Sequence, residues 1–394
     1  MIALINSKIN LFVKGRKETF SILGHQIKKE DKTIWLHAAS LGEYEQGLPI
    51  LEQLKHVYPS HKIVLSFFSP SGYEVKKDRA PADIVVYLPM DTIANAREFI
   101  SIVNPSLAIF IKYEIWPNFL KELKRGSTPI LLVSAIFSRR QIFFKPYGGF
   151  MRKSLKSFSH FFIQDDDSKK LLKTIGIDNC TVNGDTRFDR VSQILNNNNT
   201  LGFMGSFKGD TNCMVAGSTW PEDEEVIVNH INTTSKDLKF VIAPHNIKSS
   251  HIEKLLKNID KNTILYSKME GQNLNTFDVL IIDTIGILTK IYSYANIAYV
   301  GGGFATGLHN TLEPAVFGIP VIIGPNYQGF KEAEDLVVLK GIISIRNKTE
   351  FKNQLEQLLS DKELFQKTSE INSAYIKEKI GATELVMNHI AELI

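Results

Sequence analysis

Short apolar runs recur along the chain from about residue 33, and most are followed by a stretch with helical spacing of apolar residues. This alternation predicts a parallel β-sheet covered by helices. Helices are predicted between the strands, for example at Pro49–His56 and Ser168–Ile175. The strands predicted in the first half are Thr33–Ala38, Lys62–Phe67, Ile84–Tyr87, Leu107–Phe110, Ile130–Val133 and Phe161–Ile163.

The alternation stops between residues 191 and 213, where the chain is polar and rich in asparagine and glycine, and we interpret this stretch as a linker. A second series of strands follows, and the tail from Glu350 is predicted to be helical. The strands are Met214–Ala216, Phe240–Ala243, Thr263–Leu265, Val279–Ile282, Ile297–Val300 and Val321–Ile323. Since 394 residues exceed one usual core, we predict an α/β protein with two Rossmann-like domains, residues 1–195 and 210–394, facing a central cleft.

The strand Ile297–Val300 runs into three consecutive glycines, and a short polar loop then leads to a helix that opens near Glu313. In a parallel βαβ unit, ligands bind beyond the carboxyl ends of the strands. Glycines allow backbone amides to approach a phosphate, and a helix amino terminus adds about half a positive charge. Glu313 could accept hydrogen bonds from two ribose hydroxyls. Alternatively, Glu313 only complements the helix dipole and the glycines only form a tight turn.

Two loops of the first domain follow predicted strands and carry carboxylates. Glu43 is predicted on the first crossover loop, before a helix that begins at Pro49, and Glu114 follows the strand Leu107–Phe110. A carboxylate at the carboxyl edge of a sheet can take a proton from an attacking hydroxyl group. On position alone, Glu43 could equally be a solvated loop residue.

Positive charge is concentrated in the first half: residues 1–190 hold 28 basic and 19 acidic residues, whereas residues 191–394 hold 18 and 23. Basic residues alternate with Phe and Tyr between Ser134 and Lys156, which suits a surface that meets anionic lipid headgroups. Arg139 and Arg140 are candidates for binding a phosphate. The same mixture could hold single-stranded nucleic acid, or could be a solvated loop, but no RNA-binding signature accompanies it.

Loops of the second domain supply further polar groups after predicted strands. Ser218 and Thr219 could donate hydrogen bonds to a phosphate or a carboxylate, or could simply cap the following helix. Asp165-Asp166-Asp167 looks like a metal site, but it precedes a helical stretch, and we interpret it as a helix entrance.

Four motifs in combination resemble those of the 3-deoxy-D-manno-octulosonic acid (Kdo) transferases of lipopolysaccharide synthesis, which are GT-B glycosyltransferases. The motifs are Ser40-Leu-Gly-Glu43, Trp116-Pro-Asn118, Ala216-Gly-Ser-Thr219 and His309-Asn-Thr-Leu-Glu-Pro314. The resemblance covers most of the chain, from about Thr33 to the helix after Phe330.

The resemblance implies an inverting enzyme that moves Kdo from CMP-Kdo to a lipid A precursor, lipid IVA, with no cofactor and no metal. Glu43 would be the general base, and the first domain would bind the acceptor through Glu114, Arg139 and Arg140. The second domain would bind the donor, and the last helix would cross back to the first domain. The implied donor-binding residues are Ser218, Thr219, Pro244, His245, Ile285, Gly286, Ile287, Gly302, Asn310, Thr311, Leu312 and Glu313.

Two positions depart from the family pattern: Lys112 stands where a carboxylate is more usual, and His245 where an arginine is more usual. The second change would make anion binding weaker or dependent on pH. Two alternatives therefore remain. One is a GT-B glycosyltransferase with a UDP-sugar donor and a lipid-linked acceptor, and the other is a non-catalytic nucleotide- or lipid-binding protein.

Cys180 and Cys213 have no partner spacing for a zinc site or a disulfide framework. No apolar run approaches the ~20 residues of a membrane span, and Asn6, Ser7, Lys8 and Asn10 interrupt the weakly apolar start. The longer apolar anchor common in Kdo transferases is thus mostly missing. We expect peripheral attachment to the anionic cytoplasmic face of the inner membrane, and no nucleic-acid partner.

Overall fold

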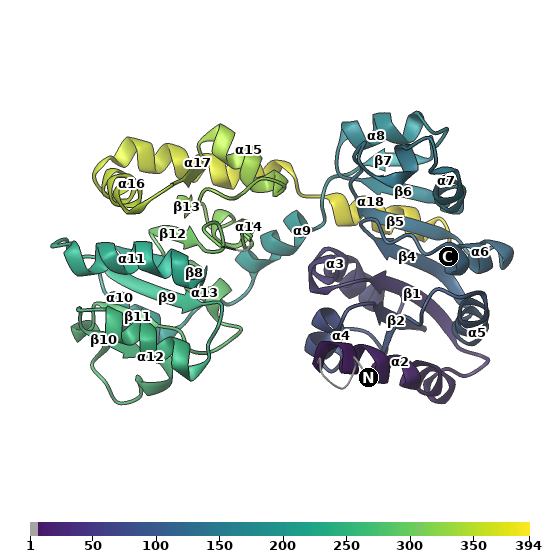
Figure 1. Ribbon diagram of the computed structural model, residues 1–394, viewed down its shortest axis with the longest axis horizontal. Coiled ribbons are helices and arrows are strands. Elements are labelled where there is room, and N and C mark those ends of the chain that lie inside the picture. Colours follow the sequence, from purple (N-terminus) through teal and green to yellow (C-terminus); the bar gives the residue numbers. More distant parts are fainter. Residues whose placement is uncertain (1–6, 306) are drawn as a thin grey trace. The chain divides into compact units, whose positions relative to one another are not determined.

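The computed structural model describes residues 7–305 and 307–394. The chain forms two compact units, each built around its own parallel sheet (Figure 1). One unit comprises Met1–Arg190 together with Lys379–Ile394, and the other comprises Val191–Glu378.

The sheet of the first unit has seven parallel strands in the order β3-β2-β1-β4-β5-β6-β7. All six predicted strands of this half are present, and the prediction missed only β7, a three-residue strand at the sheet edge. The strands are β1 (Lys32–Ala38), β2 (His61–Phe67), β3 (Ile84–Tyr87), β4 (Pro105–Ile111), β5 (Ile130–Ala135), β6 (His160–Ile163) and β7 (Cys180–Val182).

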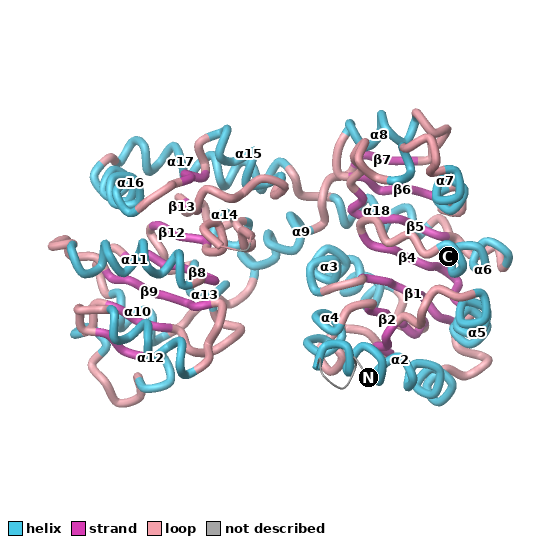
Figure 2. Tube along the Cα trace, in the orientation of Figure 1, coloured by secondary structure: helices cyan, strands magenta, loops and turns pink. Residues whose placement is uncertain are grey.

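Alternate residues of each central strand enter two separate apolar cores, one on each face of the sheet. In β1, Ile34 and Leu36 pack with α3 (Leu41–Val57) and α18 (Ala382–Ala391), whereas Trp35 packs on the opposite face. That opposite face is covered by α2 (Ser7–Gln26), α5 (Ile93–Val103), α6 (Pro117–Arg125), α7 (Gly149–Leu155) and α8 (Asp166–Lys173). Figure 2 shows these helices around the strands, with the short α4 (Pro70–Lys76) beside α3.

The prediction that Glu43 lies on a loop before a helix beginning at Pro49 is wrong. Helix α3 begins at Leu41, so Glu43 is in its first turn, and Pro49 is buried inside the helix. Proline favours the first helical turn, which is why the start was predicted there. Here Ser40, in an extended conformation, is the N-cap residue. Gly47 lets α3 lie close to the sheet, since a Cβ there would be 3.2 Å from Ile111.

The second unit also holds seven parallel strands, in the order β10-β11-β9-β8-β12-β13-β14. Its six predicted strands are confirmed, and the prediction missed β14, a three-residue strand at one edge. The strands are β8 (Cys213–Thr219), β9 (Lys239–Pro244), β10 (Thr263–Leu265), β11 (Val279–Ile281), β12 (Ile297–Val300), β13 (Val321–Ile323) and β14 (Ile342–Ser344). Its helices are α10 (Gly202–Lys208), α11 (Pro221–Thr233), α12 (Ser249–Asn258), α13 (Leu288–Tyr292), α14 (Leu312–Ala315), α15 (Lys331–Leu339), α16 (Lys348–Ser360) and α17 (Lys362–Glu378).

The stretch 191–213, which was interpreted as a linker, contains regular structure. It holds the end of α9 (Arg187–Ser192), a 3₁₀ turn at Gln193–Asn196, and α10. Met204 and Phe207 of α10 are fully buried. These two apolar side chains explain why a polar, glycine-rich segment still folds against the second unit.

A buried carboxylate, that of Asp189 in α9, binds the start of helix α18. Asp189 accepts hydrogen bonds from the amides of Gly381 and Thr383, at 2.6 and 2.7 Å, and from the Thr383 hydroxyl at 2.7 Å. Val386 and Ile390 of α18 have no exposed surface, and they belong to the same core as α3. The chain therefore finishes within the unit in which it started.

A buried histidine makes the stability of the second unit depend on pH. His230 of α11 packs between Phe240 and Phe351, and neither ring nitrogen has a hydrogen-bond partner among the described residues. Burial lowers its pKa below the ordinary value. Between that lowered pKa and about 6.5 the unfolded chain binds more protons, so stability falls as the pH drops through this window.

We expect His230→Leu to reduce the loss of stability that the wild type shows as the pH drops. The free energy of unfolding in urea, measured at pH 7.5 and 5.5, should fall further in the wild type than in the variant. The difference should be on the order of 1 kcal/mol for each unit by which the pKa is lowered. An identical pH response in both proteins would contradict the assignment.

Residues 1–6 lie outside the described residues, so the expectation for the start of the chain can be followed only from Ser7, where α2 begins. Within the described part of the chain, no helix combines the length and the apolar character needed to cross a membrane.

Candidate functional site

Each sheet has one place where the strand order reverses, and polar loops gather there. In the first unit this place lies between β1 and β4, and in the second it lies between β8 and β12. Chains that leave neighbouring strands at such a place run in opposite directions, which opens a crevice at the carboxyl edge of the sheet. Glu43 and Glu114 follow β1 and β4, while Ser218 lies at the carboxyl end of β8 and Gly302 follows β12.

Glu43 projects from the first turn of α3, directly after β1, and its side chain is half-buried. The Ser40 hydroxyl donates a hydrogen bond to Oε2 of Glu43. No described residue donates to Oε1. One carboxylate oxygen is thus oriented by the helix start, and the other accepts no hydrogen bond from the described residues.

A buried network beneath Glu114 was not predicted. The ring of His37, which has no exposed surface, makes 2.8 and 3.1 Å contacts from Nδ1 to the hydroxyl and carbonyl oxygens of Ser66. The Trp116 indole N–H is 3.1 Å from His37 Nε2 and 2.9 Å from Glu114 Oε2. When Nε2 accepts the Trp116 N–H, Nδ1 is the ring nitrogen that donates to Ser66.

This network fixes Trp116 and Glu114 at the switch point of the first sheet. The sequence holds one hint of the network, the polar His37 inside an otherwise apolar strand. Trp116 both packs and donates: its ring centroid is 4.8 Å from that of Phe68, and its indole N–H binds Glu114.

Three residues just at or past strand ends have left-handed backbone conformations that are costly without glycine. They are Lys112 after β4, Ser134 in β5 and Ser218 in β8, with φ of 69°, 53° and 53°. Such strain costs about 1–3 kcal/mol per residue and is concentrated at functional sites. Two of the three, Lys112 and Ser218, lie at the carboxyl ends of β4 and β8, strands that border a switch point.

Arg139 and Arg140 lie on the loop after β5, and both are exposed. The structure gives neither of them an acidic partner among the described residues, and it does not bring them into the network of His37 and Glu114. Their role in binding a phosphate stays a prediction.

The glycines after β12 are required by close packing of backbones. A Cβ at Gly301 would lie 2.3 Å from the Ser218 carbonyl oxygen, and one at Gly303 would lie 2.7 Å from the Gly324 nitrogen. Gly302 has φ of 92°, and a Cβ there would be 2.1 Å from the Gly307 carbonyl oxygen. The glycines thus hold the carboxyl ends of β8, β12 and β13 together.

Asp223, which was not predicted, holds the glycine loop to α11. Its carboxylate has no exposed surface and accepts hydrogen bonds from the amides of Gly302 and Trp220, at 2.8 and 2.9 Å, and from the Tyr299 hydroxyl at 2.7 Å. The Gly302 amide is therefore already used within the protein. The sequence indicates this role of Asp223 only by an acidic residue in the first turn of a helix that follows a strand.

The loop before α14 places its polar groups around one carboxylate. Glu313 accepts hydrogen bonds from Asn310 Nδ2 at 3.1 Å and from the Thr289 hydroxyl at 2.7 Å. Helix α14 is a single turn, Leu312–Ala315, so its dipole contributes less positive charge at the loop than the sequence predicted. The Thr311 hydroxyl is buried and has no partner among the described residues.

Rings of Trp220, His245 and His309 stack at the carboxyl ends of β8 and β9. The ring centroids are 4.8 Å apart for Trp220 and His245, and 4.7 Å for His245 and His309. The Trp220 indole donates to His309 Nε2 at 3.0 Å. Burial, and then the neighbouring His245, lower the pKa of His309, so this imidazole stays neutral and accepts that bond.

The remaining predicted donor-binding residues lie on the same edge of the second sheet. Thr219 is buried and donates its hydroxyl to Glu224 at 3.0 Å, whereas Ser218 is half-buried. Pro244 ends β9, and Leu312 begins α14 with no exposed surface. The loop from Ile285 to Ile287 leads into α13, and Ile285 is 82% exposed.

The interpretation of Asp165-Asp166-Asp167 as a helix entrance is confirmed. Asp165 is the N-cap of α8, and its carboxylate accepts the Ser168 amide at 2.7 Å.

Known proteins of one family are similar to nearly the whole chain. Residues 14–190 match the family model described as 3-deoxy-D-manno-octulosonic-acid transferase. The 3-deoxy-D-manno-octulosonic acid transferase of Aquifex aeolicus is 30% identical over 356 residues, which are 88% of this chain and 92% of that protein. The transferase of the same name from Haemophilus influenzae is 28% identical over 405 residues, which are 98% of this chain and 93% of that protein.

Solved structures support the fold. The UDP-GlcNAc 2-epimerase of Neisseria meningitidis, at 15% identity, superposes with a TM-score of 0.64 over 92% of this chain and all of the epimerase. A calicheamicin glycosyltransferase, at 12% identity, gives 0.58 over 92% of this chain and 98% of that chain. The predicted GT-B type of fold, with two Rossmann-like domains, is thereby confirmed.

Proposed function

This chain belongs to the family of 3-deoxy-D-manno-octulosonic acid (Kdo) transferases, and we propose that it transfers Kdo from CMP-Kdo to lipid IVA with inversion at the anomeric carbon. Membership of the family makes it a glycosyltransferase that acts with Kdo in lipopolysaccharide synthesis. The choice of donor and acceptor, and the roles of individual residues, are the content of the proposal.

In the proposed reaction, Glu43 accepts the proton of the acceptor hydroxyl. The hydroxyl oxygen then attacks the anomeric carbon of Kdo, and the bond from that carbon to the phosphate oxygen of CMP breaks. The free Oε1 and the Ser40-bound Oε2 of Glu43 support this role, because one oxygen is held in place while the other can accept. Glu114, held by Trp116 beside His37, is proposed to orient the acceptor sugar.

The donor is proposed to bind at the carboxyl edge of the second sheet. Glu313 would accept ribose hydroxyls, while Ser218 and Asn310 would donate to the phosphate or to the Kdo carboxylate. His245 contributes less fixed positive charge than an arginine would at its place. The exposed Ile285 supports a role for its loop in covering the base.

The acceptor is proposed to reach the first unit from an anionic membrane. Arg139 and Arg140 are exposed cations without acidic partners among the described residues, and they are suited to the phosphates of lipid IVA. The basic, aromatic surface between Ser134 and Lys156 supports a peripheral location on the cytoplasmic face of the inner membrane.

The observation that carries the proposal is that both sets of family motifs converge on the switch points of their sheets. Glu43 and Glu114 do so in the first unit, and Ser218 and the loop to Glu313 do so in the second.

A comparison of nucleotides tests the donor. We expect CMP to raise the melting temperature of the full chain and to be displaced by CMP-Kdo, whereas UDP should have little effect. Stabilisation by UDP and not by CMP would replace the proposal with a UDP-sugar transferase. The stacked His245, in place of the arginine usual in the family, is the observation that keeps this second candidate in view.

A further inference from the structure

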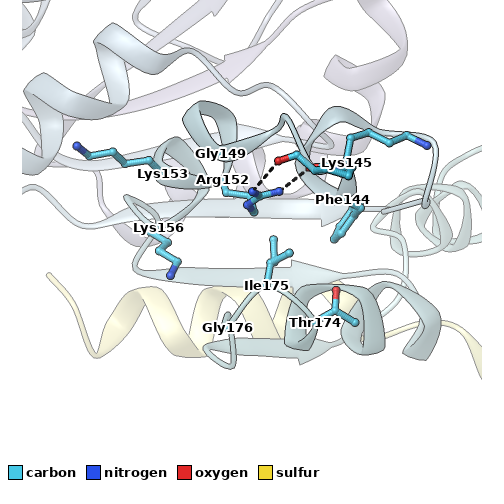
Figure 3. Close-up of a pocket in the computed structure, with 10 residues that line it drawn as sticks. Phe144, Lys145, Gly149, Arg152, Lys153, Lys156, Thr174, Ile175 and Gly176 are labelled. Carbon is cyan, nitrogen blue, oxygen red and sulfur yellow. Dashed lines mark hydrogen bonds between the residues drawn. The ribbon is translucent and has the colours of Figure 1, made fainter.

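A basic groove lies on the helical face of the first unit that is opposite α3 and α18. One wall is formed by α7 and the turn that precedes it, and the other by the Thr174–Gly176 turn (Figure 3). The volume of the groove is about 780 Å³. Four cationic side chains line it, namely Lys145, Arg152, Lys153 and Lys156, and no acidic residue does. Helix α3, which carries Glu43, covers the opposite face of the sheet from α7, so this groove is separate from Glu43.

The guanidinium of Arg152 is held in position without a counter-charge. It donates to the carbonyl oxygens of Phe143 and Lys145, at 3.1 and 2.7 Å, and more weakly to that of Pro146 at 3.4 Å. These bonds use NH1 fully and NH2 in part, which leaves Nε and one N–H of NH2 for a ligand. Figure 3 shows Arg152 in the middle of the groove, above Ile175.

Lysines extend this positive charge along the groove. Lys153 and Lys156 lie on one side of Arg152 and Lys145 on the other (Figure 3). None of the three ammonium groups forms an ion pair with a described residue. A Cβ at Gly176 would lie 4.0 Å from the Lys156 ammonium, so this group lies over the turn. Four like charges around one hollow repel each other, and a bound anion would relieve that repulsion.

Large apolar side chains border the same helix. Tyr147 and Phe150 are 78% and 71% exposed, and they flank the start of α7. Phe150 and Lys153 also line a second groove between α6 and α7, of about 460 Å³, with Lys121 and Lys124. Exposed aromatic rings among unpaired cations are suited to the boundary between lipid headgroups and acyl chains.

We infer that the groove between α7 and the Thr174–Gly176 turn binds the phosphate of an anionic phospholipid headgroup while Tyr147 and Phe150 enter the membrane interface. Arg152 supplies a fixed, directional contact, and Lys153 and Lys156 supply charge. Charge complementarity and the neighbouring exposed rings favour a phospholipid surface over a free phosphate or a nucleic acid. The inference rests on the proposed membrane location of the surface between Ser134 and Lys156 and adds the groove and the lipid group that it binds, but it does not depend on the donor or on the reaction.

Vesicle sedimentation with the full chain tests this. The variant is Lys153→Ala/Lys156→Ala, and its matched control is Lys362→Ala/Lys367→Ala, two exposed lysines of α17 with no ion pair among the described residues. With phosphatidylglycerol vesicles, the first double variant should bind about thirtyfold more weakly than wild type, since each basic residue near an anionic surface contributes on the order of 1 kcal/mol. The control should bind like wild type, and vesicles of phosphatidylcholine alone should retain little of any of the three proteins.

Phe150→Ser provides a second variant that does not alter charge, and it should weaken binding to the same anionic vesicles. Equal losses in the two double variants would overturn the inference, because net charge alone would then explain binding. Full displacement from the vesicles by millimolar glycerol phosphate would assign the groove to a free phosphate instead. Tighter binding of single-stranded RNA than of vesicles, lost in Lys153→Ala/Lys156→Ala, would also overturn it.

Discussion

Replacing Glu43 with glutamine is expected to lower the rate of Kdo transfer by about 10²- to 10⁴-fold, which is the usual contribution of a general base. The amide keeps the size of the side chain and can still contact the Ser40 hydroxyl, but it cannot accept a proton from the acceptor. The measurement is the turnover number at saturating CMP-Kdo and lipid IVA. Binding of CMP should be unchanged, because Glu43 belongs to the first unit and the proposed donor site to the second.

Glu45→Gln is the matched control for this variant. Glu45 lies two residues further along α3, and it forms ion pairs with Lys76 and Arg190 on the surface of the first unit. It should retain the activity of the wild type. If Glu43→Gln and Glu45→Gln turn over equally fast, Glu43 is not the base, although the enzyme assignment would survive.

Replacing Gly302 with alanine is expected to destabilise the second unit by roughly 2–6 kcal/mol, the sum of backbone strain and overpacking. The residue has φ of 92°, and the added methyl group would stand 2.1 Å from the Gly307 carbonyl oxygen. A shift of the loop to relieve this clash would also stretch the bond from the Gly302 amide to Asp223. Urea unfolding and the affinity for CMP should both report the change.

Gly271→Ala separates backbone strain from overpacking. Gly271 also has a left-handed φ, 74°, but nothing lies within 4 Å of the position of its Cβ. We expect it to cost only the strain, about 1–3 kcal/mol, and to leave the affinity for CMP unchanged. If the two variants lose the same stability, close packing is not what requires glycine at position 302.

Patterns of consecutive residues predicted the sheets well. The central strands are buried on both faces, so each appears in the sequence as a continuous apolar run, as in Ile297–Val300. The strands Cys180–Val182 and Ile342–Ser344, each three residues long and at a sheet edge, were missed. The start of α3 was misplaced because Pro49 is a local signal, whereas its burial against the sheet is decided by tertiary packing.

The candidate site was predicted only where its residues follow strands in short motifs. Glu43, Glu114 and Ser218 were found in this way, and the topology places them at the switch points. His37 and Asp223 act through partners 29 and 79 residues away, Ser66 and Gly302, which no local pattern indicates. The glycines after β12 were predicted to let backbone amides approach a phosphate. In the structure the Gly302 amide donates to Asp223 instead, and close contacts between backbones are the reason why glycine is needed at these positions.

The most direct test of the central claim is transfer by the purified full chain from CMP-Kdo, generated in place, to tetraacylated lipid IVA, followed by mass spectrometry of the lipid. The proposal predicts a lipid product heavier by whole Kdo residues, with release of CMP in equal amount. No Kdo-bearing lipid from a folded preparation, together with transfer from a UDP-sugar to the same acceptor, would contradict it.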